Sequence, residues 1–513
     1  MASPTERARP GEAPGSPTAA RGLTGSAAAV TAVAVVAGLA LLAMLRTEST
    51  VPAQPPNRSF DPPAAANPTR PVQPPRALLG AGSCTSSGCH ASPVEGHAAW
   101  QSSYTVWATR DPHARAERVL HEPLAAQIVA LLATRTPTQP PVPAHEHTAC
   151  IGCHATGRGP LARDGVSCES CHGPAGDWLV AHTLPGWHAA GNTLGMVDLA
   201  DPFVCGQQCA GCHVGGPPTA DGLPREVSHD LIAAGHPRLA FELRSFKQAE
   251  PPHWRDRFAR GEATAPGKVL EPSALDPLDE WALGRLGAVH VFLDQIARQT
   301  AASTLPPEAG TAAVWPEFTA FDCYGCHRPP VAAVDRDAPP TATPRRAPLG
   351  TPRLEPLHLA LLDIALPAEV AARLTAFRAD VEQRWWQQPD GATIVACLDA
   401  IDAARAHVHP ALSNTPAGTV AARVVGQVDP STWDEAAAAH AALEALVARA
   451  AARGTPRESL GPAVARLEKL RGLLEFPAST ADRPERFDSP HQYDARAVAT
   501  ELKAIAAALE AVR

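Results

Sequence analysis

The spacing of apolar residues divides the chain into segments of different character. An uncharged apolar run extends from Ala27 to Leu45, and as a helix it would be roughly 28 Å long, close to the hydrocarbon thickness of a bilayer. Arginines precede this run. The pattern therefore predicts a cytoplasmic N-terminal segment over 1–26, a transmembrane anchor over 27–45 and an exported remainder. A cleaved signal peptide is the alternative interpretation.

Two proline-rich stretches separate the segments that follow the anchor. Residues 46–79 and 331–355 combine prolines with few large apolar side chains, which is typical of stiff, extended linkers. Between them, residues 80–330 show poor periodicity, dense turn residues and no alternation that predicts a strand. Short helices are predicted there at 98–109, 117–134, 229–236 and 280–300.

Residues 356–513 have the periodicity of amphipathic helices. In the last helix the apolar positions recur at intervals of four and three residues, at Val498, Leu502, Ile505, Leu509 and Val512. Two helix-start signals resemble capping boxes, formed by Thr455, Pro456 and Glu458 and by Ser489, Pro490 and Gln492. We expect a bundle of four or five helices in which Cys397 is a small buried residue. The predicted fold class is mainly α: a loop-rich domain over 80–330 with little strand, a helical bundle and a transmembrane helix.

The candidate chemistry lies in five cysteine motifs, each of which ends in a histidine. Four have the form C-x2-C-H, and one, CTSSGCH, has four residues between its cysteines. The cysteine pairs are Cys84 and Cys89, Cys150 and Cys153, Cys168 and Cys171, Cys209 and Cys212, and Cys323 and Cys326. The histidines that follow them are His90, His154, His172, His213 and His327.

Three kinds of chemistry use closely spaced cysteines. Zinc ribbons have similar spacing, but zinc gives no reason for a histidine directly after every second cysteine. Redox dithiols are expected in a thioredoxin-like βαβ context, which this chain lacks. Covalent attachment of haem c requires this arrangement, because two thiols bond the porphyrin and the adjacent histidine supplies an axial nitrogen. We therefore predict five covalently bound haems, which would also replace part of the apolar core.

The second axial ligands are also expected to be histidines. Met196 is the only methionine in the exported part, so His/Met ligation can occur at most once. The leading candidates are His113, His182, His229 and His236, of which the last two lie seven residues apart and are expected on one helical face. Weaker candidates are His97, His253 and His358. Cys205 is interpreted as a free or structural thiol.

Residues 80–215 resemble the cytochrome c-554 and hydroxylamine oxidoreductase-like superfamily of multihaem c-type cytochromes. The resemblance rests on block order: Trp107 with DPHARA, then CIGCHATG, then GVSCESCHGPAG followed by His182, then CAGCHVG. It implies a multihaem electron-transfer fold in which His113 and His182 are distal ligands. The wider first motif, the fifth motif, the anchor and the bundle depart from the family pattern.

Two functions remain open at this point. The first is an electron carrier on the periplasmic side of the inner membrane, with redox proteins as partners and a quinol-linked membrane protein as one candidate donor. The second is a haem oxidoreductase acting on hydroxylamine, nitrite or nitric oxide at one open-coordinated iron. A net charge of -8 gives no basic field for nucleic acid. No catalytic residue can be named from the sequence.

Overall fold

The computed structural model describes residues 76–92, 99–134, 142–184, 187, 194–251, 253, 275–303, 315–323, 351–475 and 493–512. The predicted anchor over 27–45 and nearly all of the two predicted linkers lie outside these residues. Among the helices that the structure describes, none is long and apolar enough to cross a bilayer. The described residues all belong to one unit, 59–513, and the predicted domain boundaries inside it stay predictions.

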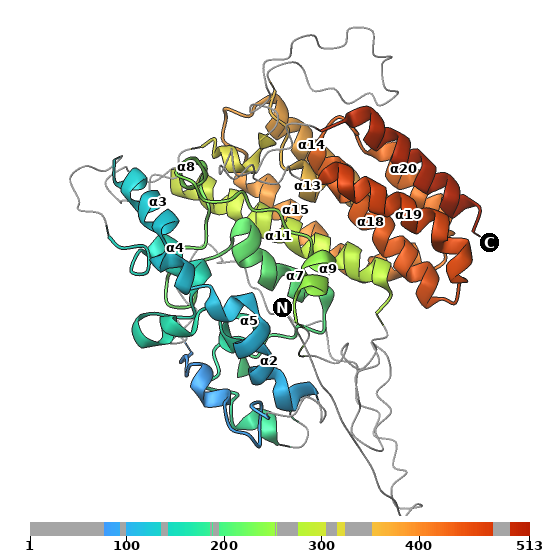
Figure 1. Cartoon of the computed structure of the whole chain (residues 1–513). Helices are drawn as coiled ribbons and strands as arrows, with labels where there is room; N and C mark the ends of the chain where they lie inside the picture. The colour runs from blue at the N-terminus through green and yellow to red at the C-terminus, as the bar shows by residue number, and fades with distance from the viewer. Residues whose placement is uncertain are drawn as a thin grey trace, which may run out of the picture. The chain divides into compact units, whose positions relative to one another are not determined.

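The described part of the chain is mainly α-helical, as the sequence predicts (Figure 1). Its only β-structure is a pair of isolated bridges, between Gly216 and Arg225 and between Phe321 and Leu354. The helices before residue 304 are α2 (Ser103–Arg110), α3 (Pro123–Ala133), α4 (Thr148–His154), α5 (Cys168–His172), α7 (Pro202–Ala210), α8 (His229–Ala233), α9 (Leu243–Ala249) and α11 (Pro277–Ser303). Short 3-10 turns precede or link them, including η1 (Ala81–Cys84), η2 (Ala99–Ser102), η3 (Pro112–Arg115) and η4 (Arg118–His121).

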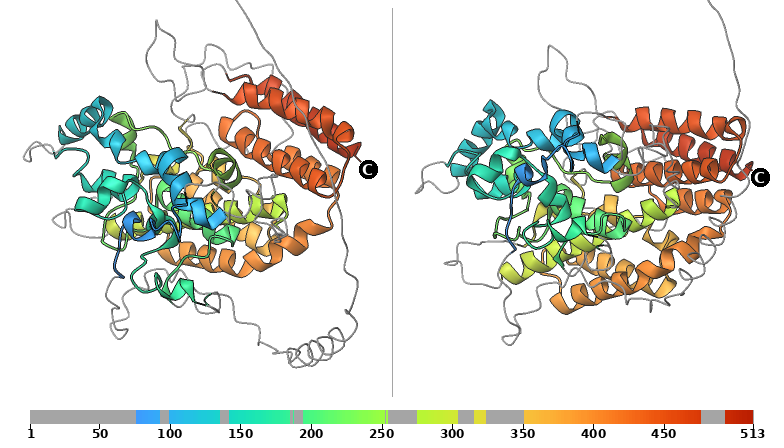
Figure 2. Two further views of the ribbon diagram at one scale, coloured as in Figure 1. Left: turned by 60° about the horizontal axis from the view of Figure 1, so that its bottom comes forward. Right: turned by 90° about the horizontal axis from the view of Figure 1, so that it is seen from below.

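The C-terminal helices carry most of the apolar core. They are α13 (Pro356–Leu359), α14 (Ala368–Gln383), α15 (Gly391–Ala404), α16 (Val408–Ser413), α17 (Ala417–Gln427), α18 (Trp433–Ala452), α19 (Arg457–Leu474) and α20 (Ala495–Glu510). Helices α18, α19 and α20 lie side by side in both views of Figure 2. The predicted stripe on α20 is confirmed, because Val498, Leu502, Ile505 and Leu509 are buried. Cys397 is fully buried, also as predicted.

Helix α11 joins the cysteine-rich part to the bundle. It packs against α7 and α9 on one side and against α13, α15, α16 and α18 on the other (Figure 1). Most of its buried apolar residues, among them Trp281 and Leu293, belong to the same apolar cluster as the bundle, while Ala288 and Val291 pack in a second cluster with Phe241 and Leu243. The helix therefore supports the part of the chain that carries the fourth cysteine motif.

Helices α7 and α11 approach so closely that glycine is required at their crossing. A Cβ atom at Gly206 would lie 2.5 Å from the carbonyl oxygen of Gly284. Since such a contact forces a backbone shift, the absence of side chains at Gly206 and Gly287 permits the contact between the two helices, while that at Gly284 makes room for Leu243 of α9.

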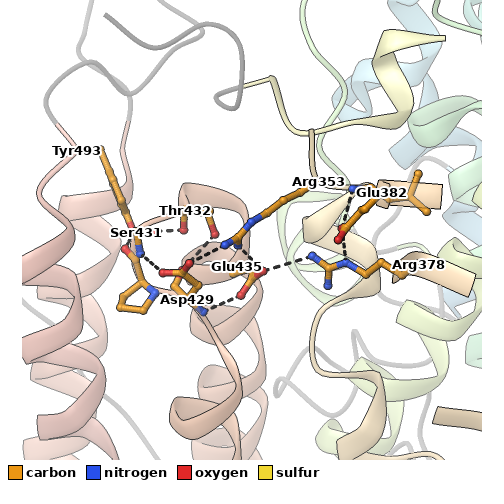
Figure 3. Close-up of polar contacts among 10 residues, drawn as sticks. Arg353, Arg378, Glu382, Asp429, Ser431, Thr432, Glu435 and Tyr493 are labelled. Atoms are coloured by element: carbon orange, nitrogen blue, oxygen red, sulfur yellow. Dashed lines mark hydrogen bonds and ion pairs between the residues drawn. The ribbon is translucent and has the colours of Figure 1, made fainter. Parts of the chain in front are cut away.

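A network of ion pairs holds residues 351–355 against the bundle (Figure 3). Arg353 lies between Asp429 and Glu435, with nitrogen–oxygen distances of 2.7 and 3.0 Å. The backbone N–H of Leu354 donates to Glu382, which also pairs with Arg378. This segment forms the bridge to Phe321, so the network fixes the chain next to the start of the fifth motif.

Two of the predicted helix starts differ from the structure. Helix α19 begins after Pro456, and no side chain caps it, so Thr455 is not a cap. Helix α20 begins at Ala495, where the Asp494 side chain accepts hydrogen bonds from the backbone N–H groups of Arg496 and Ala497. The proposed cap at Ser489, with Pro490 and Gln492, lies outside the described residues.

Candidate functional site

Two of the motif histidines, His154 and His172, end short helices that run directly through their cysteine pairs, α4 and α5. The fourth motif spans the end of α7 and the π-turn η8 (Gly211–Gly215). The first begins at the last residue of η1, and Cys323 begins the fifth. Cys326 and His327 lie outside the described residues.

None of the described motif cysteines forms a disulfide, and some from different motifs lie close together. Cys84 of the first motif is within hydrogen-bonding distance of Cys168 of the third, and this contact lowers the pKa of Cys84 to about 6. Cys153 of the second motif has the same relation to Cys212 of the fourth, which lowers the pKa of Cys212 to about 6. The first and third motifs are therefore neighbours, as are the second and fourth.

Three motif histidines face a histidine from a distant part of the chain. The ring centroids of His90 and His182 are 6.1 Å apart, those of His113 and His213 are 6.1 Å apart, and those of His154 and His236 are 6.3 Å apart. The planes of the first pair are nearly parallel, at 11°, whereas the other two pairs are near perpendicular, at 77° and 82°.

This separation fits two imidazoles on opposite sides of one metal. Imidazole nitrogens bond transition metals at about 2.0–2.1 Å, and the ring centre lies roughly 1.1 Å further away, so two coaxial rings have centroids about 6.2 Å apart. Direct stacking would bring two rings closer, as for His121 and His145 at 4.3 Å. The three pairs thus fit axial ligation of haem iron.

Hydrogen bonds at Nδ1 set the tautomer of these rings. His90, His154 and His236 donate from Nδ1 to the carbonyls of Trp100, Ala116 and Pro237, at 2.6, 3.0 and 2.8 Å. His182 donates likewise to Leu179. A carbonyl can only accept, so Nδ1 carries the proton and Nε2 is the unprotonated nitrogen, the form in which an imidazole binds a metal.

His113 differs because its Nδ1 faces carboxylates. The Asp111 Oδ1 atom lies 2.9 Å from Nδ1, and a Glu250 oxygen lies 3.3 Å away. Hydrogen bonds to Asp111 and Glu250 raise the pKa of His113 to about 10. Its partner His213 packs against Phe241 and Phe246, and burial lowers the pKa of His213 to about 4.

The third motif is arranged differently from the other described motifs. Burial lowers the pKa of His172 to about 4, and within the described part of the chain its Nδ1 has no hydrogen-bond partner. No described histidine forms a facing ring pair with it. The histidine whose charge acts most strongly on it is His253.

His229 lies beside the segment that leads into the fifth motif. Its backbone N–H donates to Glu317 at 2.8 Å, and its ring packs edge-on against Phe318. Cys323 itself lines a small pocket of about 40 Å³ together with Arg238 and His358. The bundle therefore contributes to the surroundings of this motif.

The expectation that His229 and His236 share a helical face is wrong. Helix α8 ends at Ala233, and Gly235 has a φ of +116°, which takes the chain out of the helix. His236 consequently reaches His154, while His229 contacts Phe318. His97 lies outside the described residues.

Three functional positions were missed by the sequence analysis. Asp111 and Glu250 are described above. Glu169, inside the third motif, is buried and accepts backbone hydrogen bonds from Leu79, Gly80 and Ala175 at 2.7–3.0 Å. It holds the start of the described chain against the motif. A carboxylate within a cysteine motif was the available signal, but its partners are distant in sequence.

The motifs and the facing histidines define a c-type cytochrome, to which haem c is bound covalently. The model of the family described as Cytochrome c554 and c-prime matches residues 84–173, and this match supports a c-type cytochrome of the cytochrome c554 and hydroxylamine oxidoreductase-like kind. The match spans the first three motifs, within the region where the resemblance was found. No curated protein and no solved structure matches the chain.

Proposed function

We propose that the chain is a membrane-tethered, periplasmic pentahaem cytochrome that carries electrons between redox partners. The observation that supports it most is the set of three histidine pairs, each of which joins a motif histidine to a ring from another segment at 6.1–6.3 Å. Haem c supplies reversible one-electron transfer when both axial positions are filled by such ligands.

The chain's own residues would hold each cofactor in a defined way. Each cysteine pair supplies two thioether bonds and the following histidine supplies one axial nitrogen. His182, His236 and His113 would supply the second nitrogen at the first, second and fourth motifs. For the third motif we propose His253, and for the fifth we propose His229, which lies against the preceding segment.

The contacts between motifs support a continuous path for electrons. Cys84 touches Cys168, and Cys153 touches Cys212, so cofactors at these motifs would be neighbours. The Gln208 side chain, next to Cys209, donates to the backbone carbonyl of Ser170, which brings the third motif close to the fourth. The proposed order of sites is therefore first, third, fourth, second.

A second candidate function is a haem oxidoreductase for hydroxylamine, nitrite or nitric oxide. It is favoured by His172, which lacks a facing histidine among the described residues. If His253 does not ligate the third iron, that site is open to a small molecule. The two functions therefore differ at one coordination position.

Haem content and spin state test both candidates. Pyridine haemochrome and intact mass of the holoprotein should give five haems per chain, and a lower count would reject the pentahaem proposal. The carrier function predicts that all iron is low spin. The site of the parallel pair, His90–His182, should give one type of EPR signal, and the sites of the two near-perpendicular pairs should give another. A high-spin signal that shifts with nitric oxide, unchanged in His253→Ala, would favour the oxidoreductase.

Substitution of a paired histidine tests the ligand assignment. His182→Ala should convert one haem to high spin and abolish the signal of the parallel pair. His121→Ala is the matched control, because His121 stacks on His145 and hydrogen-bonds Glu117. Unchanged low-spin spectra in both variants would reject His182 as a ligand.

A further inference from the structure

The three histidine pairs differ in the charge around their Nδ1 atoms. In the pairs His90–His182 and His154–His236, the Nδ1 contacts described above are made to neutral backbone carbonyls. At His113 the Nδ1 proton lies between two carboxylates. The difference concerns the ligand proposed for the fourth motif.

Asp111 is held rigidly in this position. Its side chain is buried, and the same Oδ1 atom that faces His113 Nδ1 also accepts the backbone N–H of His113 at 2.9 Å. It caps the turn η3, so the ring and the carboxylate are fixed by one short loop. The contact therefore persists without any rearrangement of the chain.

Glu250 reaches the same nitrogen from a distant segment. It follows the last residue of α9, which packs against α7 and α11. Helix α7 leads directly into the fourth motif. One packed unit consequently carries both the Glu250 carboxylate and His213, which fixes the position of this carboxylate relative to the rings of His113 and His213.

We propose that Asp111 and Glu250 are positioning residues that make the His113–His213 site the hardest of the three paired sites to reduce. This inference rests on the proposed function. Negative charge on the outer nitrogen of an axial imidazole increases its electron donation and stabilises the ferric over the ferrous state. With haem bound there, reduction would add one electron, supplied by the redox partner, to the iron, and the proton would stay on Nδ1 of His113.

The site would act as a step in the electron path. In the proposed order it stands between the third and second motifs, so a low potential there would slow passage to the second motif until the earlier sites are reduced. The carboxylates would thus set the direction in which the cluster fills with electrons.

The test uses holoprotein in which the charges are removed and the hydrogen-bond acceptors are kept. Asp111→Asn retains an oxygen for the backbone N–H of His113, and Glu250→Gln retains one for Nδ1. In a redox titration followed by absorbance and EPR, we expect one component to become at least tenfold more reduced at a fixed potential. That change equals a positive shift of about 59 mV for one electron. The double variant should shift it further.

Glu117→Gln is the matched control, because Glu117 also bonds a histidine, His121, that is not proposed as a ligand. It should leave every component in place. Should Asp111→Asn fail to fold, Glu250→Gln alone decides, since Glu250 is partly exposed. Unchanged potentials with five low-spin haems would overturn the carboxylate proposal and leave the carrier function standing. If His113→Ala still has five low-spin haems, His113 is not a ligand, and both the ligand assignment at the fourth motif and the carboxylate proposal are rejected.

Discussion

The ion pair between Arg238 and Asp434 offers a direct measure of how strongly the haem-binding part is attached to the bundle. Arg238 Nη2 lies 2.8 and 2.9 Å from the two carboxylate oxygens of Asp434 on α18. The Asp434 side chain is fully buried, and that of Arg238 is 13% exposed. Replacing Asp434 with Asn removes the charge and leaves the guanidinium buried, while the volume hardly changes.

The expected cost follows from Coulomb attraction and its partial replacement. Two unit charges about 4 Å apart interact by about 4 kcal/mol at an effective dielectric of about 20, and removal of one partner of a buried pair costs about 3–5 kcal/mol. Two other acids, Asp322 and Glu355, act on this cluster. Their attraction to Arg238 persists and their repulsion of Asp434 is relieved, so we expect about 3 kcal/mol, the lower end of that range.

Urea unfolding of the holoprotein measures this loss. Burial raises the pKa of Asp434 to about 6 although Arg238 opposes it, so the assay is run at about pH 8, where the carboxyl is ionised. Far-UV circular dichroism reports the helices and Soret absorbance reports the haem-binding part. Asp434→Asn should lower the midpoint in both signals by the free energy divided by the measured m-value.

A surface pair provides the control. Asp380 on α14 and Arg384, which directly follows that helix, are about half exposed, so Asp380→Asn should cost under about 1 kcal/mol. The double variant Arg238→Met with Asp434→Leu removes both charges and should cost less than Asp434→Asn, because no guanidinium then stays buried without Asp434. If Asp434→Asn behaves like Asp380→Asn, the reasoning about this pair is refuted.

Three further predictions concern other buried contacts. Glu169→Gln leaves one oxygen for three backbone donors and should lower the free energy of unfolding by roughly 2–4 kcal/mol, with faster hydrogen exchange at Gly80; unchanged exchange would contradict this role. In a thermal unfolding assay, Gly206→Ala should destabilise the protein by about 1–3 kcal/mol, because the added Cβ meets α11. Gly472→Ala in α19 should stabilise it by about 0.5–1 kcal/mol in that assay, because nothing lies within 4 Å of the added Cβ. Burial raises the pKa of Glu355 from 4.5 to about 8, so in this pH range the folded state binds more protons than the unfolded state, and the free energy of unfolding falls as pH rises from 4.5 to about 8. Glu355→Gln should remove this pH dependence of the free energy of unfolding, and a retained dependence would assign it to another group.

The sequence predicts best those features that depend on neighbouring residues. The stripe on α20 repeats within one helix, so its burial follows from periodicity alone. The cysteine motifs are equally local, and the family match to residues 84–173 confirms the inference of covalent haem. The cap at Thr455 was wrong because a helix can start after proline without a side-chain acceptor.

Contacts between distant segments could not be predicted from the sequence. His182 was a candidate ligand, but nothing local indicates that it faces His90 of the first motif, and not His172, which precedes it by ten residues. The one-face pattern for His229 and His236 failed because Gly235 ends the helix between them. The contact between Glu250 and His113 joins residues far apart in the sequence, so only the placement of α9 beside the turn that carries His113 shows it.

The crossing of the histidine pairs has a consequence for how the exported chain matures. In the proposed arrangement, the second nitrogen for the first motif would come from beyond the third, the one for the second from beyond the fourth, and the one for the fourth from before the second. If the chain is exported as proposed, coordination of these three sites would wait until about residue 236 has crossed the membrane, although attachment could proceed earlier at each motif. Three overlapping loops of about 80 to 100 residues would then be closed through metal ligation, as a disulfide closes a loop. Excess imidazole, which competes for iron, should therefore loosen the fold more than thiol reductants do.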